Sequence, residues 1–401
     1  MDIQGETTGT RRGILAGVKV LDLTRVLAGP YASMILADMG AEVVKVEMPG
    51  RGDDSRAFPP FKQGQSMYYG QVNRNKKSLV LDLKSPQGKA VFKQLVPHFD
   101  IVLENFRPGV MQHLGLDYAV LEKLNPGLIY GAVSGFGQTG PYSQRAGYDI
   151  IAQAMSGLMS VTGWPKGEPT RTGPAMADIL GGLNLATGVL AALFNRQRTG
   201  HGDLVDISLL DCSFSAMDIL PQLYFVDGQI PQRLGNFYPT NYPYDSFRAR
   251  NGSYVIGAGN DKLFAAVCGV LGRPELAQDE RFCTDARRAE HHAALKAIIE
   301  DWSSQRDTAQ IVASLTEAGV PAGEIYTVDQ AVVDPHLAQA RNMVVTVDDP
   351  QMGETRLTGT TFKFKYGQSS VRHLAPRLGQ DTDQVLEEFL GKNAAELGLK
   401  K

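Results

Sequence analysis

The chain has 401 residues, too many for one ordinary hydrophobic core, so we expect two or more domains. Hydrophobic residues make up 43% of the chain and charged residues 21%, a composition typical of a globular protein and not of a disordered one. The formal net charge of −3 excludes a broadly basic surface, so we expect neither nucleic acid nor an anionic membrane as a partner.

The cysteines and the apolar stretches narrow the class further. Cys212, Cys268 and Cys283 are widely spaced, so we expect neither a disulfide framework nor a metal site. Residues 1–13 lack the apolar core of a signal peptide, and the longest apolar stretch, 179–194, is shorter than a membrane span. We therefore expect a cytoplasmic protein that no membrane anchors.

Short strands alternate with helices along the N-terminal half. Helices are predicted at 29–40, from Ser85 onward and at 117–124, and each lies between two predicted strands. This alternation is typical of an α/β fold with a parallel sheet and helices on its faces. The strands of this Rossmann-like sheet are predicted at 17–24, 41–47, 77–83, 100–106, 127–136 and 202–211.

Changes in composition divide the chain after this sheet. We assign 14–215 to the large α/β domain, and the Pro-, Asn- and aromatic-rich 216–250 to a linker and active-site loop. A strand at 252–259 followed by helical segments indicates a smaller α+β domain at 251–325. The remainder, 326–401, is mixed: strands are predicted at 343–349 and 355–364, and a helix at 381–390.

Three segments at strand ends are candidates for binding an anion. "TRVLAGP" (24–30) places small residues at a helix N-terminus, which favours phosphates, although a close-packed turn explains it equally simply. "NRNKKS" (73–78) concentrates three cations, and a solvated charge run is the commoner reading. "ENFRPG" (104–109) sets Asn105 and Phe106 at the carboxyl end of a strand, where open α/β sheets bind ligands. No dinucleotide-binding fingerprint accompanies them.

Candidate nucleophiles are few. The histidines lack the contexts of a metal site or hydrolase triad, Ser134 in "SGFG" is misplaced for a nucleophile elbow, and the thiols are isolated. Asp178 begins a long apolar stretch, where a buried charge must be bonded, neutralised or used. As an aspartate before a helix it is either an N-cap or a catalytic carboxylate, and these two roles are compatible.

Several segments together resemble the formyl-CoA and carnitine CoA-transferase family, the class III coenzyme A transferases. The resemblance covers nearly the whole chain. It implies a large domain built from both chain ends, so that 326–401 returns to it, and a homodimer whose chains interlock as two linked rings. The segments are "LDLTRVLAGPYASMILADMGAEVVKVE", "NRNKKSLVLDLKSPQGK", "ENFRPG", "GYDIIAQAMSG", "DILGGLNLATGVLAAL", "GDLVDISLLD", "GNDKLF" and "PRLGQDT".

The resemblance also implies that coenzyme A binds as a substrate across the strand-to-helix turns, with no tightly bound cofactor. Formyl-CoA transferases have a glutamine in place of Leu27 and basic residues in place of Met48, His113 and Ser134. The positions that match CoA contacts are Val26, Leu27, Ala28, Asn75, Lys76, Asn105 and Phe106.

The catalytic aspartate of the family matches Asp178. The implied mechanism passes through a mixed anhydride and an aspartyl-CoA thioester. Gly257, Ala258 and Gly259 follow a predicted strand, and their amides could stabilise the oxyanions. Gly181 and Gly182 are expected to leave room for the thioester to approach.

Three functions remain open at this point. The favoured one is transfer of CoA from a small acyl-CoA such as succinyl-CoA to a small mono- or dicarboxylic acid, with 236–247 shaping the acyl pocket. Racemisation of a 2-methylacyl-CoA is less favoured, because such racemases have a histidine where this chain has Tyr148, and a tyrosine is a poor base at neutral pH. The third is a non-catalytic CoA-binding protein in which Asp178 only caps a helix.

Overall fold

The computed structural model describes residues 12–399, which form two compact units. Unit 1 consists of 12–159, Arg171–Asp227 and 335–399, and unit 2 consists of Ser160–Thr170 and Gly228–Asp334. Residues 1–11, which include most of the segment without a signal-peptide core, lie outside the described residues.

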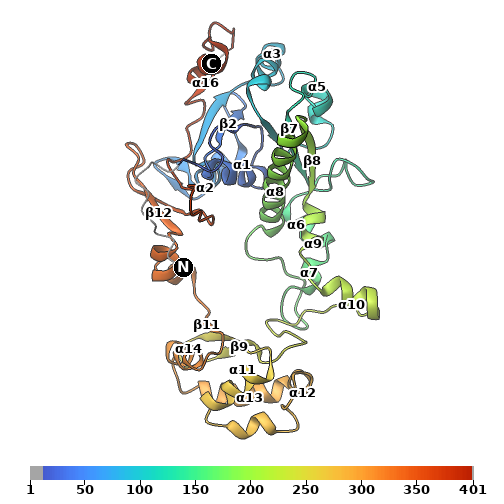
Figure 1. Cartoon of the computed structure of the whole chain (residues 1–401), viewed down its shortest axis with the longest axis vertical. Coiled ribbons are helices and arrows are strands. Elements are labelled where there is room, and N and C mark those ends of the chain that lie inside the picture. The colour runs from blue at the N-terminus through green and yellow to red at the C-terminus, as the bar shows by residue number, and fades with distance from the viewer. Residues whose placement is uncertain (1–11, 400–401) are drawn as a thin grey trace. The chain divides into compact units, whose positions relative to one another are not determined.

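Unit 1 is built around the predicted parallel sheet, which is confirmed. Its six strands are all parallel, in the order β5-β2-β1-β6-β7-β8 (Figure 1). Each strand is short and contains at least one β-branched residue, and each is connected to the next strand of the sheet through at least one helix. The bounds are β1 Lys19–Asp22, β2 Glu42–Glu47, β5 Lys76–Val80, β6 Ile101–Glu104, β7 Ile129–Ser134 and β8 Asp203–Ser208.

Alternate side chains of these strands enter two separate cores. In β1, Val20 packs with α1 (Ala28–Asp38) and α8 (Met176–Thr199), whereas Leu21 packs in the core that contains residues of α3 (Pro86–Leu95) and α16 (Thr382–Leu390). Both side chains are fully buried, and burial of an aliphatic side chain stabilises the fold by about 1.5–3 kcal/mol. The two cores sandwich the sheet between helical layers.

Helix α8 is longer than the apolar stretch 179–194, which alone is too short to span a membrane. It has 24 residues because it includes further residues at both ends of that stretch, and by length and composition alone it could cross a membrane. In unit 1 it packs against α1, β7, β8 and α9 (Leu209–Ser215), and Leu185 and Val189 are fully buried. A core helix of a folded domain meets the same criteria of length and composition.

The C-terminal segment lies in unit 1. Asp381 accepts a hydrogen bond from the amide of Ser78 (2.8 Å) and Thr382 accepts one from the amide of Val80 (3.1 Å), so this segment covers the free edge of β5. Figure 1 shows α16, in red, near α3 from the N-terminal half. Further elements of unit 1 are β3 Phe61–Lys62, β4 Gln65–Ser66, α2 Met67–Asn73, α4 Val110–Leu114, α5 Tyr118–Leu121, α6 Asp149–Met155, α10 Leu220–Asp227, β12 Val344–Val347 and β13 Thr355–Thr358. The short helix α7 Leu158–Val161 begins in unit 1, and its last two residues belong to unit 2.

Unit 2 has an antiparallel sheet in the order β11-β10-β9, covered by helices. Its own core includes Phe247, Tyr254 and Phe264, all nearly fully buried. The buried Arg288 donates to the backbone oxygen atoms of Tyr242 (2.6 Å) and Phe282 (2.9 Å) and ties the loops of this unit together. Its elements are β9 Tyr244–Arg248, β10 Ser253–Gly257, α11 Asp261–Val270, α12 Asp285–Glu290, α13 His292–Ser303, α14 Thr308–Glu317, β11 Ala322–Glu324 and α15 Val328–Ala331.

Candidate active site

Asp178 is the third residue of α8, and it does not cap the helix. Ala175 occupies the N-cap position and makes no side-chain cap hydrogen bond. Instead Asp149, the first residue of α6, accepts hydrogen bonds from the amides of Ala177 (2.8 Å) and Asp178 (3.4 Å). A carboxylate at a helix N-terminus stabilises the helix in this way. The cap interpretation of Asp178 is therefore wrong, since Asp149 fills that role.

The carboxylate of Asp178 is left without a partner. Among residues 12–399 it accepts no hydrogen bond and forms no ion pair, although it is largely buried. Burial and then the charge of Asp149 raise the pKa of Asp178 to about 7. A carboxylate with a raised pKa is more basic than an ordinary one, so its ionised form is a stronger nucleophile.

Gly181 and Gly182 allow α8 to pack closely. A Cβ atom at Gly182 would lie 2.6 Å from the carbonyl oxygen of Ala28, and one at Gly181 would lie 2.5 Å from a methyl carbon of Leu209. Real Cβ atoms do not approach so closely, so a side chain at Gly182 would push α8 away from the backbone of α1, whereas one at Gly181 would require the Leu209 side chain to shift. The two glycines therefore serve helix packing, which differs from the expectation that they leave room for a thioester.

A cavity of about 170 Å³ opens beside Asp178. It brings together the predicted residues Val26, Leu27, Ala28, Asn105 and Phe106 with the predicted nucleophile. The other lining residues are Arg25, Asp54, Arg107, Pro108, Val133, Ser134, Gly135, Arg145, Ala146, Gly147, Tyr148 and Leu209.

Side chains from two neighbouring segments hold the turn before α1 in a fixed shape. The Asn105 side chain accepts a hydrogen bond from the amide of Arg25 (2.8 Å) and donates one to its carbonyl oxygen (2.7 Å). Asp53 accepts a hydrogen bond from the amide of Val26 (3.1 Å), whose φ of 67° lies in the left-handed region. Asn105 thus fixes the conformation of the turn.

The start of α1 presents unpaired amides. Leu27 is its N-cap residue and makes no side-chain cap hydrogen bond. Within the described part of the chain, the amides of Leu27, Ala28 and Gly29 donate no hydrogen bond. Leu27 and Ala28 line the cavity beside Asp178. Donors of this kind at a helix N-terminus favour an anion or a developing oxyanion.

A second cavity, of about 490 Å³, adjoins the first and shares Arg25, Phe106 and Arg107 with it. Its walls combine apolar residues such as Leu81 and Leu83 with cations that the sequence analysis did not single out. Lys84, four residues after the end of β5, and Arg107, within "ENFRPG", form no ion pair in the described part of the chain. Both residues follow the ends of predicted strands, and this position was the sequence feature that could have identified them as ligand-binding candidates.

The other three cations of this cavity are paired with carboxylates: the buried Lys45 with Asp53 (2.9 Å), and Arg25 and Arg51 with Asp54. Asp54 accepts ion pairs from both Arg25 (3.2 Å) and Arg51 (2.6 Å). The guanidinium of Arg25 also lies 5.3 Å from the ring centre of Phe106. Lys84 and Arg107 are therefore the cations most available to an anionic ligand.

Lys76 and Asn75 lie elsewhere. Lys76 is fully buried, and its ammonium contacts Asp22 (3.0 Å), Ser33 (2.8 Å) and Asn73 (2.8 Å). Neither residue lines the cavities described above. Because β5 begins at residue 76, the Lys76 side chain points into the protein and not out of a loop, so the structure gives it an interior role in place of the CoA contact.

Asn75 is likewise committed to structural contacts. Its amide nitrogen donates to Asp38 (2.7 Å) and to the carbonyl oxygen of Ser370 (2.8 Å), and its oxygen accepts from the amide of Arg372 (2.7 Å). These bonds tie the C-terminal segment to α1. The contacts of Asn75 thus explain its presence without a ligand.

Gly257, Ala258 and Gly259 lie in unit 2, at and just after the end of β10. The amide of Gly257 donates to the carbonyl oxygen of Pro321 (2.9 Å) and that of Ala258 to the carbonyl oxygen of Pro243 (2.8 Å). Two of the three proposed oxyanion donors are therefore already bonded within unit 2. The amide of Gly259 donates no hydrogen bond in the described residues.

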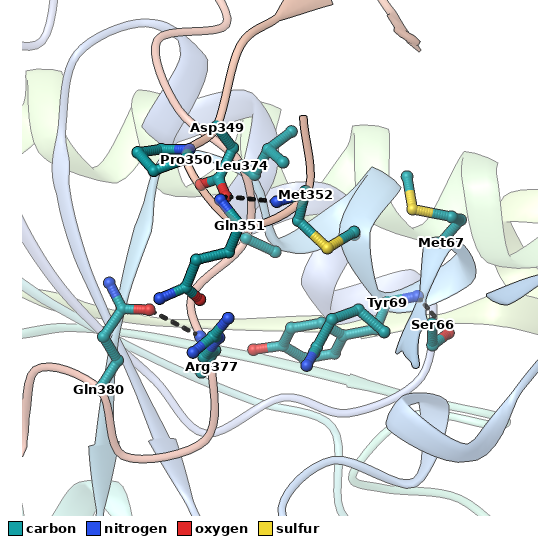
Figure 2. A pocket seen from close by; sticks show the side chains of 13 residues that line it. Ser66, Met67, Tyr69, Asp349, Pro350, Gln351, Met352, Leu374, Arg377 and Gln380 are labelled. Carbon is teal, nitrogen blue, oxygen red and sulfur yellow. Dashed lines mark hydrogen bonds between the residues drawn. The ribbon is translucent and has the colours of Figure 1, made fainter. Parts of the chain in front are cut away.

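Another cavity, of about 260 Å³, lies between α2 and the C-terminal segments 349–352 and 374–380. Figure 2 shows that its polar groups satisfy one another locally: Asp349 accepts from the amide of Met352 (2.9 Å), and Gln380 accepts from the amide of Arg377 (3.0 Å). None of the predicted site residues lines it. Over residues 12–399, no group of three or more His, Cys, Asp or Glu side chains could hold a metal ion.

The chain also matches a family model and known proteins over most of its length. Residues 15–382 match the model of CoA-transferase family III. Succinyl-CoA–D-citramalate CoA-transferase of Chloroflexus aurantiacus is 41% identical, and the match covers 96% of each chain. Human succinyl-CoA:glutarate CoA-transferase is 37% identical over 96% of this chain and 88% of that protein.

A solved structure is similar over the same length. The CaiB/BaiF family protein from Brucella suis superposes with a TM-score of 0.84 at 38% identity, covering 94% of this chain and all of that one. The match to the family model and the full-length relatives agree, so this chain belongs to CoA-transferase family III.

Proposed function

We propose that this protein transfers CoA from a small acyl-CoA, such as succinyl-CoA, to a small carboxylic or dicarboxylic acid, with Asp178 as the nucleophile. The observation that carries the proposal is the unpartnered carboxylate of Asp178 in a cavity that also contains unpaired backbone amides. Relatives named for succinyl-CoA with citramalate or glutarate support this class of donor and acceptor.

The chemistry begins at the Asp178 oxygen. The carboxylate attacks the thioester carbon, the carbon–sulfur bond breaks, and a mixed anhydride and CoA thiolate form. The thiolate then attacks the aspartyl carbonyl and displaces the donor acid, leaving an aspartyl-CoA thioester. The acceptor carboxylate attacks this thioester, and the released thiolate finally takes the acceptor acyl group and frees Asp178.

The amides at the start of α1 are suited to the charged steps. Each tetrahedral intermediate carries an oxyanion, and amides that are already oriented stabilise such a charge at little reorganisation cost. We assign this role to the amides of Leu27 and Ala28, which line the cavity beside Asp178. The hydrogen bonds of Gly257 and Ala258 argue against those two amides.

The adjoining cavity is suited to the nucleotide part of CoA. Its Lys84 and Arg107 would meet phosphates, while Leu81, Leu83 and Phe106 offer an apolar surface. The shared wall at Arg25, Phe106 and Arg107 would let the pantetheine arm reach Asp178.

We also propose a homodimer of interlocked chains, in the cytoplasm. The support is α10, in which no residue is buried and in which Phe225 and Val226 are 65% and 75% exposed. Apolar helices of this kind cover one another in protein interfaces. Light scattering after size exclusion would give twice the mass of the chain, and a monomer at micromolar concentration would contradict the proposal.

Trapping tests the function. The protein is incubated with succinyl-CoA and then with hydroxylamine or borohydride, and the peptide containing Asp178 is weighed. Modification of Asp178 supports the transferase, and an unmodified Asp178 across a broad panel of acyl-CoA donors contradicts it. Deuterium exchange at the α-carbon of a 2-methylacyl-CoA would instead indicate a racemase, and CoA binding without either reaction would indicate a binding protein.

A further inference from the structure

The loop between β7 and α6 forms one wall of the Asp178 cavity. Its two ends are joined by the glycines at 135 and 147: a Cβ atom built on Gly135 would lie 2.6 Å from the Cα of Gly147. This close approach of two backbones closes the loop at its base. The residues just before α6, Arg145 to Tyr148, then line the cavity together with Asp178.

Arg145 is held in place by aromatic packing. Its guanidinium carbon lies 4.4 Å from the ring centre of Tyr142, and that ring packs edge-on against Phe136 with 5.7 Å between ring centres. The amide of Arg145 also donates to the carbonyl oxygen of Tyr142 (2.8 Å). Stacking on a ring orients a guanidinium and leaves its N–H groups free to bind in its plane.

The positive charge of Arg145 has no counterpart in the described residues. It lies within ion-pair distance of no carboxylate there, and it is exposed. Asp178 lines the same cavity and also lacks a partner. Arg145 and Asp178 are thus both available to a ligand.

The three cations of the Asp178 cavity differ in position. Arg25 and Arg107 also line the adjoining nucleotide-sized cavity, and Arg25 is paired with Asp54. Arg145 alone lines only the cavity that holds Asp178. It is therefore the cation placed for the acyl end of a substrate and not for its phosphates.

We propose that Arg145 binds the distal carboxylate of a dicarboxylic substrate while the other carboxyl group reacts at Asp178, so that the site selects dicarboxylic over monocarboxylic acids. This inference rests on the proposed function. An ionised Asp178 repels the second carboxylate of the substrate and an acylated Asp178 is neutral, so the charge of that carboxylate needs a separate cation. A guanidinium can donate two parallel hydrogen bonds to a carboxylate in one plane. The methyl end of a monocarboxylic acid accepts no hydrogen bond, so it gains nothing from Arg145.

The test compares two acceptors of similar length, glutarate and pentanoate, at saturating succinyl-CoA. We expect Arg145→Gln to lower kcat/KM for glutarate about 10- to 100-fold, mainly through KM, and to change that for pentanoate less than about threefold. Arg145→Lys should restore part of the preference. Arg198→Gln, an exposed arginine near the end of α8, is the matched control and should behave as wild type.

The outcomes separate the inference from the function on which it rests. An equal fall for both acceptors would assign Arg145 to CoA binding or to folding, and an unchanged preference would remove its role in selection; either overturns the inference. In both cases the Arg145→Gln protein that still forms the aspartyl-CoA thioester from acetyl-CoA leaves the transferase function intact. A wild-type protein that forms no such adduct with any donor contradicts the function itself.

Discussion

Two groups of charged side chains in unit 1 differ in whether they form ion pairs. In the strands of the sheet and the loop after β2, Lys76 pairs with Asp22 (3.0 Å) and Lys45 pairs with Asp53 (2.9 Å), and all four side chains are fully buried. In the cavity beside α8, Asp178 and Arg145 have no ion-pair partner among residues 12–399. Buried charges that are paired hold the fold together, whereas unpaired charges that face a cavity are available for a ligand.

The largest effect is expected at the unpaired carboxylate. Asp178→Asn removes the nucleophile, so kcat should fall by about a thousandfold or more while CoA still binds. The matched control is Asp211→Asn, because Asp211 is also the third residue of its helix but is exposed and lines neither cavity. Steady-state transfer rates measure this, and substantial activity in the Asp178 variant would return the residue to a structural role.

A substitution in the buried ion pair of Lys76 and Asp22 should instead lower the free energy of unfolding. Lys76→Met leaves Asp22 buried without its counter-ion, and breaking such a pair costs about 3–5 kcal/mol in the free energy of unfolding. Lys77→Met is the control, since the half-exposed pairs of Lys77 with Glu42 and Glu388 are worth about 0–1 kcal/mol. Urea unfolding followed by circular dichroism compares the two. If Lys76→Met were stable but lost CoA affinity, the ligand role first assigned to this lysine would stand.

A smaller effect is expected at the cations of the adjoining cavity. Lys84→Ala should raise the KM for acyl-CoA about five- to tenfold with kcat nearly unchanged, because one exposed contact to a phosphate is lost. Lys89→Ala in α3, outside both cavities, is the control. An unchanged KM for the Lys84 variant over a range of salt concentrations would argue that the phosphates bind elsewhere.

The smallest effect concerns stability against pH. The pKa of Asp178 is about 7 in the folded state, above its ordinary value of 3.8, so the folded protein binds this proton more tightly than the unfolded one. The contribution of Asp178 is therefore fully favourable below about pH 4 and declines as pH rises to about 7. Asp178→Asn should thus be more stable than wild type at pH 8, by roughly 1 kcal/mol after allowance for partial exposure, and similar to it near pH 4.

Thermal unfolding at the two pH values measures this difference. Asp211→Asn should show no such pH-dependent gain. A Tm difference between Asp178→Asn and wild type that does not change with pH would contradict the raised pKa. If Asp178→Asn loses activity and gains stability at pH 8, the unpaired carboxylate of Asp178 contributes to catalysis at a cost in stability.

Much of the fold of unit 1 could be predicted from the sequence, because βαβ units are local. The predicted strand at 41–47 is observed at Glu42–Glu47, and the helix predicted at 381–390 is observed at Thr382–Leu390. Long-range contacts could not be predicted in this way. The predicted strands at 343–349 and 355–364 pair with each other as β12 and β13, and nothing in either segment alone specifies its partner.

The site shows the same division. Asp178 could be found because few other nucleophiles exist and the surrounding segments resemble a family. The capping role of Asp149 could not be predicted from the sequence, because Asp149 lies 28 residues before Ala177, whose amide donates a hydrogen bond to it. Lys76 was predicted to lie in a loop, because the strand was expected to begin at residue 77, but it is the first residue of β5. The sequence alone does not distinguish a loop cation from an inward-facing strand residue. Arg145 lies in an irregular loop, where no periodicity marks which side chains meet a cavity.

The way the C-terminal segment covers β5 has a consequence for how the protein is made. The amides of Ser78 and Val80 at the edge of the sheet are satisfied by Asp381 and Thr382, which leave the ribosome long after the strand itself. Unit 2 ends at Asp334 and can therefore be complete while unit 1 still has an open strand edge. Such an edge is a template for pairing with another chain, so a nascent or truncated polypeptide that lacks Asp381 and Thr382 is exposed to aggregation.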